Sequence, residues 1–438
     1  MFEILSWSHR FLFIFFLITF FIISVAIYFY GKKHMSPFMP VIIILTAAFS
    51  FALMSVNDTI RDYKAIYIGL IFCLRYIIVR ELIIKLLKIE EVLLFDLVNM
   101  LLTIGLIWLY RIEPQYATRQ LIFTLLADTM YFFIHYLLNY LYNKIDFTKD
   151  YSIYLGLFIL ITLIVTQLWG VEVYGSKNWL EILGLRFQPS EFLKIFFIIF
   201  TSIILSRGLN KNTFIYSSSS IVIIVALFAL QKDLGSALIF FAVYLIMLFI
   251  VDDKLYPTII SLFAAITMAV ISYYVFGHIQ SRVEAWLNPW KYISDKSYQV
   301  TQSLFAIASG GLVGTGLNLG YPKFIPAVHT DFIFSAICEE VGIISGIIIV
   351  LLLCIVTIIG LNYSKNSKKT VNKLICLGLS SITGIQTLII VAGVLNIVPI
   401  TGVTLPFISY GGSSLISQTI NIGLLYFINM KENGEINE

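Results

Sequence analysis

Residues 11–30 read FLFIFFLITFFIISVAIYFY, an uncharged apolar run that lies between Arg10 and the pair Lys32 and Lys33. A helix rises about 1.5 Å per residue, so about 20 apolar residues cross the hydrocarbon core of a bilayer. The run is longer than the apolar region of a signal peptide, and no small-residue cleavage site follows it. It therefore predicts a retained membrane-spanning helix.

Runs of this kind recur to the end of the chain. Of the 438 residues, 59% are hydrophobic and 12% are charged, against about 25% charged residues in soluble domains. We therefore predict an all-α polytopic membrane protein. The predicted spans are 10–30, 38–56, 64–87, 92–111, 118–142, 151–170, 189–206, 213–230, 234–251, 256–277, 332–358, 371–394 and 412–430. The span 64–87 is the weakest of these thirteen because it carries Arg75, Arg80, Glu81 and Lys85, so twelve spans are the alternative.

Lysine and arginine are concentrated in alternate connections, which predicts that these connections are cytoplasmic. They hold Lys32 and Lys33, Lys85 and Lys88, Lys144 and Lys149, Arg207 and Lys211, Lys254, the cluster Lys365, Lys368, Lys369 and Lys373, and Lys431 in the C-terminal tail. Three of the opposite connections, 171–189, 278–331 and 395–411, are long and rich in Gly, Pro, Trp and Gln. Long structured loops usually carry function, so we expect function on the extracytoplasmic face.

Cysteine spacing and charge exclude other classes of protein. The four cysteines form no CxxC pair and have no neighbouring histidine pair, so we interpret them as packing residues and not as disulfides or metal ligands. They are Cys73, Cys338, Cys354 and Cys376. The net charge of +4 is spread over the loops, which argues against a nucleic-acid partner.

The first long connection carries three cations near a tryptophan. Lys177, Arg186 and Lys194 lie near one membrane surface beside Trp179, where they could hold an anionic head group such as a pyrophosphate. Interfacial anchoring by Trp and Lys explains the pattern equally well. Glu191 lies three residues before Lys194, and for Glu191 alone we favour helix capping with a local ion pair.

Asp233 stands between two apolar runs with almost no loop around it. An ionisable residue there must be paired or line a wet cavity. Asp233 could pair with Lys232 or Lys194, or cap the next helix. We favour a structural ion pair inside a polar cavity.

Two glycine-rich segments predict irregular backbone near the membrane. The spacing of Gly314, Gly316 and Gly320 differs from a dinucleotide-binding fingerprint, and no preceding strand is predicted. These glycines favour close backbone approach or a re-entrant turn. Residues 405–414 read LPFISYGGSS and interrupt an apolar run, which is tolerated where backbone is buried in protein or lines a cavity.

The third candidate segment ends at His329, Thr330 and Asp331, immediately before an apolar run. Asp331 could cap the following helix, or it could act as a general base at the membrane surface, and the residues alone favour neither. Glu339 and Glu340 lie about 12 Å further along the same helix, which predicts an interior polar cavity. These features suit an anionic amphiphile but do not separate an enzyme from a transporter.

Taken together, these motifs resemble the shape, elongation, division and sporulation (SEDS) family, which comprises the RodA, FtsW and SpoVE proteins. The resemblance rests on residues 175–194, 231–236, 298–316, 329–340 and 405–414, in that order. It runs from about residue 93 to residue 430. It implies a ten-helix core in residues 89–438, with the catalytic loop at 278–331, and two or three extra helices in residues 1–88.

The resemblance implies a peptidoglycan polymerase in a bacterial cytoplasmic membrane, active on the extracytoplasmic face. The implied substrate is lipid II, a disaccharide-pentapeptide on undecaprenyl pyrophosphate, and the implied partner is a class B penicillin-binding protein that crosslinks the product. The implied roles are in elongation, division or sporulation, and the sequence does not separate them. The resemblance identifies no cofactor and no metal ligands, and a divalent-cation requirement stays open.

Matching the family residue by residue places its catalytic aspartate at Asp331. Its essential tryptophan falls on Trp179, and its cavity residues fall on Glu191, Lys194 and Asp233. The remaining candidates for substrate binding are Lys177, Arg186, Gln299, Gln302, His329, Thr330, Ser409, Gly411, Gly412 and Ser413.

Three positions depart from the family pattern. Asn178 replaces a basic residue, Lys232 replaces a proline and Ala327 replaces a glutamate. A lipid II flippase is the alternative function, because Asp233 with Glu339 and Glu340 could supply an interior path. The position of the long loops outside the membrane argues against a flippase. A scaffold that recruits a crosslinking enzyme ranks last, since it leaves the charged residues unexplained.

Overall fold

The computed structural model describes residues 2–56, 62–87, 92–142, 151–173, 175–182, 184–252 and 254–433. Its helices are α1 (Phe2–Tyr30), α2 (Phe38–Ser55), α3 (Tyr63–Leu86), α4 (Leu93–Ile112), α5 (Pro114–Tyr142), α6 (Ser152–Trp169), α7 (Pro189–Leu205), α8 (Lys211–Leu230), α9 (Leu234–Val251), α10 (Tyr256–Val275), α11 (Gly277–Leu287), α12 (Tyr298–Gly310), α13 (Ile333–Asn366), α14 (Thr370–Val394) and α15 (Gly412–Glu432). Its strands are β1 (Val171–Val173), β2 (Ser176–Ile182) and β3 (Leu185–Phe187).

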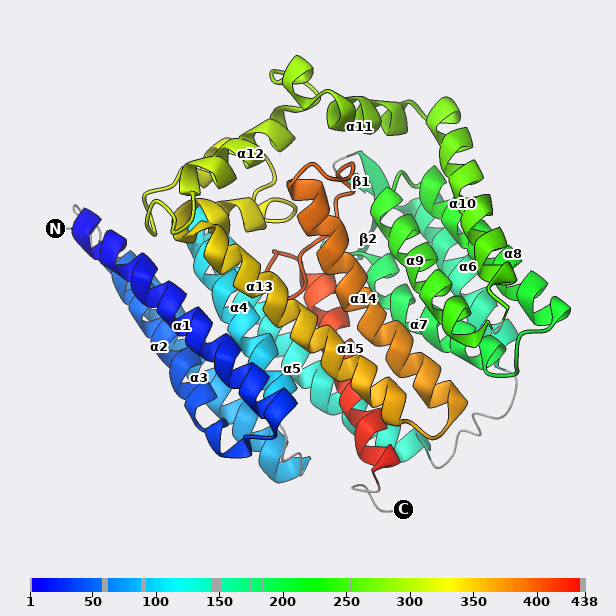
Figure 1. The fold of residues 1–438 in the computed structure, drawn as a ribbon, viewed down its shortest axis with the longest axis horizontal. Coiled ribbons are helices and arrows are strands. Elements are labelled where there is room, and N and C mark those ends of the chain that lie inside the picture. Colours follow the sequence, from blue (N-terminus) through cyan, green and yellow to red (C-terminus); the bar gives the residue numbers. More distant parts are fainter. Residues whose placement is uncertain are drawn as a thin grey trace.

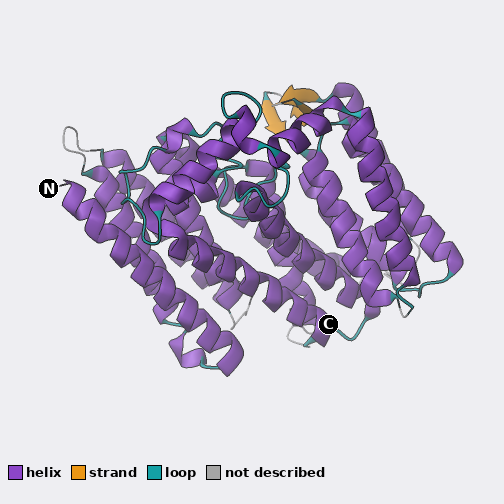
Figure 2. Ribbon diagram, turned by 45° about the horizontal axis from the view of Figure 1, so that its top comes forward, coloured by secondary structure: helices purple, strands orange, loops and turns teal. Residues whose placement is uncertain are grey.

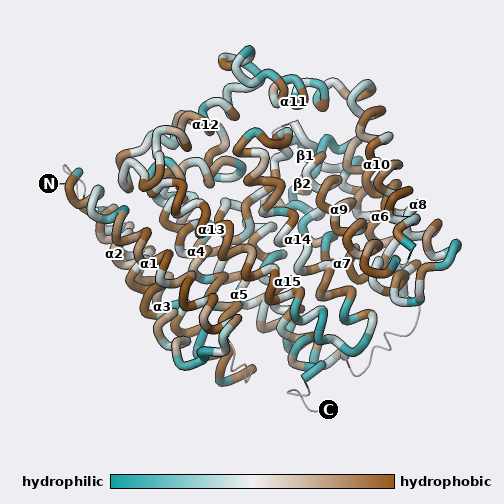
Figure 3. The backbone as a smooth tube through the Cα atoms, in the orientation of Figure 1, coloured by the Kyte–Doolittle hydropathy of each residue, from teal (hydrophilic) through white to brown (hydrophobic). Residues whose placement is uncertain are grey.

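The long helices match the predicted spans. In the described part of the chain, α1–α10 and α13–α15 fall on the thirteen predicted apolar runs, including the weak run that forms α3. Ten helices of the described residues are long and apolar enough to cross a membrane on their own. Figure 3 shows the apolar residues concentrated along the helices and the hydrophilic ones towards their ends. The chain is therefore a multi-pass membrane protein.

The charges of α3 are neutralised inside the bundle. Arg75, with a side chain 5% exposed, pairs with Asp128 of α5 and donates to Asn99 of α4. Arg80 pairs with Asp96 of α4 at 3.0 Å. Buried charges require such partners, which explains how a helix carrying these arginines can lie in a membrane. The predicted boundary between residues 88 and 89, with Lys88, Lys144 and Lys149, lies outside the described residues.

The three long connections gather at one end of the molecule. α11 and α12 arch over the helix ends, and β1–β3 lie beside them (Figures 1 and 2). The connection between α13 and α14, where the lysine cluster lies, is at the opposite end, with the C-terminal end of α15 (Figure 1). This arrangement agrees with the predicted separation of functional and cytoplasmic connections.

The end of the molecule where the connections 171–189, 278–331 and 395–411 gather, which we call the polar end, contains regular structure that the all-α prediction lacks. β2 pairs antiparallel with β1 and β3, with Trp179 opposite Val171 and Glu181 opposite Arg186. α11 and α12 lie inside the segment that we predicted as a long loop. β1 and β3 have three residues each, too few for an alternating pattern, and the seven residues of β2 do not alternate between polar and apolar.

The glycine-rich segment, residues 310–320, packs against a backbone kink in α13. Gly342 has a φ of 79°, and Ile343 N donates to Gly311 O at 3.0 Å. Gly316 N donates to Glu340 O at 2.9 Å, and a Cβ on Gly314 would lie 2.3 Å from that same oxygen. The prediction that these glycines allow close backbone approach is confirmed.

The interior polar cavity predicted at Glu339 and Glu340 is wrong. These residues are 6% and 0% exposed. Glu339 Oε1 accepts a hydrogen bond from Tyr321 N at 2.9 Å, and Glu340 pairs with Arg111 of α4 at 2.9 Å. Arg111 also donates to Gly320 O at 2.9 Å. The two carboxylates therefore fasten the glycine-rich segment to the bundle, and this contact could not be inferred from helix spacing alone.

Candidate functional site

Asp331 lies in a tight turn at the polar end. Asp331 N donates to Ala327 O at 3.2 Å, and Thr330 Oγ1 donates to the same oxygen at 3.1 Å. α13 begins two residues after Asp331, its N-cap residue is Phe332, and no side chain caps it. The capping alternative for Asp331 is therefore wrong, and the carboxylate is left for another task.

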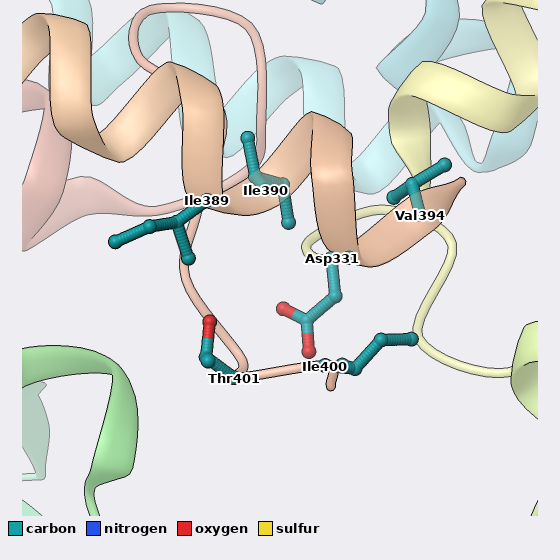
Figure 4. A pocket seen from close by; sticks show the side chains of 7 residues that line it. Asp331, Ile389, Ile390, Val394, Ile400 and Thr401 are labelled. Carbon is teal, nitrogen blue, oxygen red and sulfur yellow. The ribbon is translucent and has the colours of Figure 1, made fainter. Parts of the chain in front are cut away.

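The Asp331 carboxylate lines a narrow, tightly packed cleft. The cleft is lined by Asp331, Ile389, Ile390, Gly393, Val394, Ile400 and Thr401. Figure 4 shows the carboxylate between the α14 side chains and the segment that carries Ile400 and Thr401. Burial raises the pKa of Asp331 to about 6, although a hydrogen bond with Thr330 and the charge of Arg282 oppose the rise. A carboxylate with this pKa can accept a proton near neutral pH.

The LPFISYGGSS segment holds the Asp331 turn in place. Tyr410 N donates to His329 O at 2.8 Å, and Ser409 Oγ donates to Thr330 O at 2.5 Å. Gln120 of α5 donates to Ser409 O at 3.3 Å, so a second helix supports the contact. Of these residues, Gln120 was not predicted, because no motif in the sequence marks it.

An aromatic stack covers the other side of the turn. The His329 ring stacks on Tyr116 of α5 with centroids 4.2 Å apart and an interplanar angle of 7°. Tyr410 packs against both rings, at 5.0 Å from Tyr116 and 5.8 Å from His329. Burial lowers the pKa of His329, which keeps its imidazole neutral at physiological pH.

The remaining glycine and serine candidates join the same segment to other helices. Gly411 N donates to Gln120 Oε1 at 3.4 Å, and Ser413 Oγ accepts a hydrogen bond from Gln188 N at 3.1 Å. A Cβ on Gly412 would lie 2.7 Å from the Phe123 ring. Their contacts position the site, and a role in binding substrate stays a prediction.

Glu191 and Lys194 form a buried ion pair on α7. Lys194 Nζ lies 2.7 Å from Glu191 Oε1, with side chains 2% and 8% exposed. Ser417 of α15 donates to Glu191 O at 2.6 Å. The local ion pair favoured for Glu191 is confirmed, and Lys194 is neutralised within the bundle.

Lys177, Trp179 and Arg186 lie on the small sheet. Lys177 and Trp179 flank Asn178 on β2, where the pairing with β1 is irregular, and Arg186 of β3 lies opposite Glu181. Arg186 pairs with Glu181 at 2.8 Å, and Lys177 Nζ donates to Leu168 O at 3.3 Å. Each of the three predicted cations is thus engaged by a different partner.

Asp233 caps α9, and the ion pair that we favoured is wrong. Asp233 Oδ1 accepts from Ser236 N at 2.9 Å, and Oδ2 accepts from Ser236 Oγ at 2.7 Å. Asn178 Nδ2 also donates to Oδ2 at 2.7 Å. Free backbone amides at a helix N-terminus donate hydrogen bonds to such a carboxylate. Asn178, which departs from the family pattern, therefore holds Asp233 by a hydrogen bond without a charge.

Arg282 of α11 is the charged residue that the sequence reasoning missed. It donates to Ile400 O at 3.1 Å, beside the cleft, and its charge interacts with Asp331 and Asp233. Trp286 Nε1 donates to Asn396 O at 3.2 Å and fixes α11 over the same segment. An arginine in a segment predicted to be a loop carried no signal of this contact.

Gln299 and Gln302 lie on α12, exposed and partly buried respectively. α12 is attached to α13 through Ser303 and Ser335, whose hydroxyls lie 2.7 Å apart. Within the described residues no hydrogen bond joins either glutamine to Asp331. The described residues also contain no group of three His, Cys, Asp or Glu side chains that could hold a metal ion.

Known proteins resemble the chain over most of its length. The "Cell cycle protein" family FTSW_RODA_SPOVE matches residues 91–434. Peptidoglycan glycosyltransferase RodA of Mycobacterium bovis is 33% identical over 371 residues, 76% of each chain. Stage V sporulation protein E of Bacillus subtilis is 29% identical, covering 76% of this chain and 95% of its own.

The fold is also similar to a chain of a solved peptidoglycan synthase complex, described as coordinating polymerization and crosslinking. That similarity has a TM-score of 0.66 at 22% identity, over 77% of this chain and 97% of the other. The sequence match from α4 to α15 includes the Asp331 turn and the segment that supports it. The chain therefore belongs to the FtsW, RodA and SpoVE family.

Proposed function

We propose that the chain polymerises peptidoglycan from lipid II with Asp331 as the general base. As a member of its family it is a peptidoglycan glycosyltransferase that serves elongation, division or sporulation. The observation that supports the role of Asp331 is a carboxylate at the polar end that caps no helix and faces a cleft. Its pKa of about 6 leaves most of it ionised at neutral pH.

In this reaction Asp331 accepts the proton of the 4-hydroxyl on the acceptor N-acetylglucosamine. The hydroxyl oxygen forms a bond to the anomeric carbon of the lipid-linked N-acetylmuramic acid. The bond from that carbon to the diphosphate oxygen breaks, and undecaprenyl diphosphate leaves with both bonding electrons. Attack from the face opposite the diphosphate converts the α-linkage to a β-linkage.

The turn that carries Asp331 supports this role because it is held from several sides. Ser409 and Tyr410 bond to its backbone, and Tyr116 stacks on its histidine. A base held in one geometry loses little free energy to reorganisation when the acceptor arrives. We propose that Trp179 and Lys177, which lie two residues apart on β2, contact the substrate head group next to this turn.

We place the protein in the bacterial cytoplasmic membrane with its polar end on the extracytoplasmic side. The lysines between α13 and α14 support this orientation, because positive loops stay in the cytoplasm. We further propose that residues 1–88 are an accessory block added to the 89–438 core. A class B penicillin-binding protein is the partner that we propose, since the related solved chain comes from a complex that couples polymerization to crosslinking.

The observed contacts do not favour a flippase. Such a protein needs polar groups that line a path across the membrane. Of the candidates for that path, Asp233 caps α9, and Glu339 and Glu340 hold the glycine-rich segment. None of the three carboxylates lines the Asp331 cleft.

Polymerisation in detergent separates the two functions, because a micelle has no second side to which a lipid could be moved. We expect the purified full chain to convert lipid II into glycan strands that can be resolved by gel electrophoresis. A preparation that forms no strands, but moves a fluorescent lipid II across the bilayer of proteoliposomes, would establish the flippase instead.

A further inference from the structure

Arg282, whose charge acts on Asp331, has two further basic residues near it that lie outside the predicted site. His278 and Arg282 are four residues apart on α11, so they share one helix face. Lys232 lies in the turn before α9, and its charge acts on the His278 ring together with that of Arg282. Arg282 and Lys232, from two elements far apart in the sequence, bring positive charge to one region, whereas burial and these two charges lower the pKa of His278. We call these three side chains the basic trio.

The backbone of residues 400–401 joins this trio to the catalytic cleft. Arg282 Nη1 donates to Ile400 O at 3.1 Å, and the side chain of Ile400 lines the Asp331 cleft. A Cβ on Gly235, in the first turn of α9, would lie 2.9 Å from Thr401 O. Arg282 is thus held at the edge of the cleft, between the ends of α9 and α13.

The trio retains unused hydrogen-bonding capacity. A guanidinium has five N–H donors, and within the described residues Arg282 donates one hydrogen bond, to Ile400 O. His278 Nε2 is buried without a partner among the described residues. Lys232 is exposed. Asp233 does not neutralise them fully, because its oxygens already accept hydrogen bonds from Asn178 and Ser236.

We propose that the basic trio binds the diphosphate of the polyprenyl-linked substrate. The fork of an arginine matches phosphate oxygens two at a time, and lysine adds a point charge. The trio would stabilise the negative charge that develops as the diphosphate leaves. Lys194 and Arg186, which the sequence suggested for this task, are already paired with Glu191 and Glu181. The inference rests on the proposed polymerase function and assigns its diphosphate site.

Binding of farnesyl diphosphate to the detergent-solubilised full chain tests this assignment without catalysis. We expect Arg282→Gln to weaken binding at least about tenfold, and Arg282→Lys and Lys232→Gln to weaken it less. The matched control is Lys296→Gln, which removes an exposed cation of the same segment that pairs with Glu284 at 2.8 Å. This control should bind like the wild type. Thermal unfolding checks each variant, and Lys232→Gln carries the test if Arg282→Gln does not fold.

Competing ligands separate the sources of the anion. Inorganic diphosphate should compete with farnesyl diphosphate, whereas farnesol and phosphatidylglycerol should not. The assignment is overturned if folded Arg282→Gln binds like the wild type, or if phosphatidylglycerol competes as well as inorganic diphosphate does. Strand formation by the wild type is measured alongside. If the wild type forms strands and folded Arg282→Gln binds farnesyl diphosphate like the wild type, only this inference is refuted. If the wild type forms no strands, the proposed function is refuted whatever the binding result.

Discussion

The pKa of Asp331 predicts how polymerisation depends on pH. Burial raises this pKa to about 6, and a general base acts only when it is ionised. Activity should therefore be present above pH 6 and be lost as the pH falls through it. About nine-tenths of the carboxylates are ionised at about pH 7 and about one-tenth at about pH 5. We expect kcat/KM, which reports the free enzyme, to fall about tenfold between these two values.

Initial rates of strand formation from about pH 4.5 to about pH 8 in detergent measure this effect. Tryptophan fluorescence at each pH shows that the protein stays folded. Thr330→Val is the matched variant: its wild-type hydroxyl lowers the pKa of Asp331, so its removal should move the acid limb to higher pH. A rate that stays constant down to about pH 5 in folded protein, or a Thr330→Val limb that moves to lower pH, would refute the reasoning.

Three further predictions concern the parts that support the site. Arg75→Met leaves the buried Asp128 carboxylate unpaired and should lower the free energy of unfolding by about 3–5 kcal/mol. The double variant with Asp128→Leu should recover most of this loss in thermal unfolding, and no recovery would contradict the pairing. Gly342→Ala places a Cβ 2.2 Å from a backbone oxygen and should lower the free energy of unfolding by at least about 2 kcal/mol. Gly311 has a similar φ, but a Cβ there would meet open space. Equal losses of stability in Gly311→Ala and Gly342→Ala would therefore contradict the close backbone approach at Gly342. Tyr116→Leu removes the stacking of this ring on His329, which contributes about 1 kcal/mol, and should lower kcat several-fold. Tyr116→Phe keeps the aromatic ring and should retain most of kcat. Equal rates for the Leu and Phe variants would show that the stack does not hold the turn.

The helical framework was predictable because each span is a single apolar run with polar breaks. Even the charged run that forms α3 is helical, although the partners of its arginines lie on α4 and α5 and could not be identified from the sequence. The strands were missed because short irregular segments carry no periodic pattern. The bounds of the helices therefore follow from local sequence, whereas the pairing of their charges follows from tertiary contacts.

The site was predicted less completely for the same reason. Asp331 was identified from its position before an apolar run and from the family resemblance. Its capping alternative could be rejected only when α13 was seen to begin after Phe332. At Asp233 an ion pair was favoured over a helix cap, and the side chain caps α9. Arg282 was not predicted at all, because its position depends on how α11 crosses over Ile400.

Replacement of Asp331 by Asn measures most directly whether this carboxylate is the base. The change keeps the size of the side chain and removes its ability to accept a proton at neutral pH. We predict that purified Asp331→Asn unfolds at the wild-type temperature, binds farnesyl diphosphate and forms no glycan strands from lipid II. A folded Asp331→Asn variant that forms strands at the wild-type rate would contradict the account.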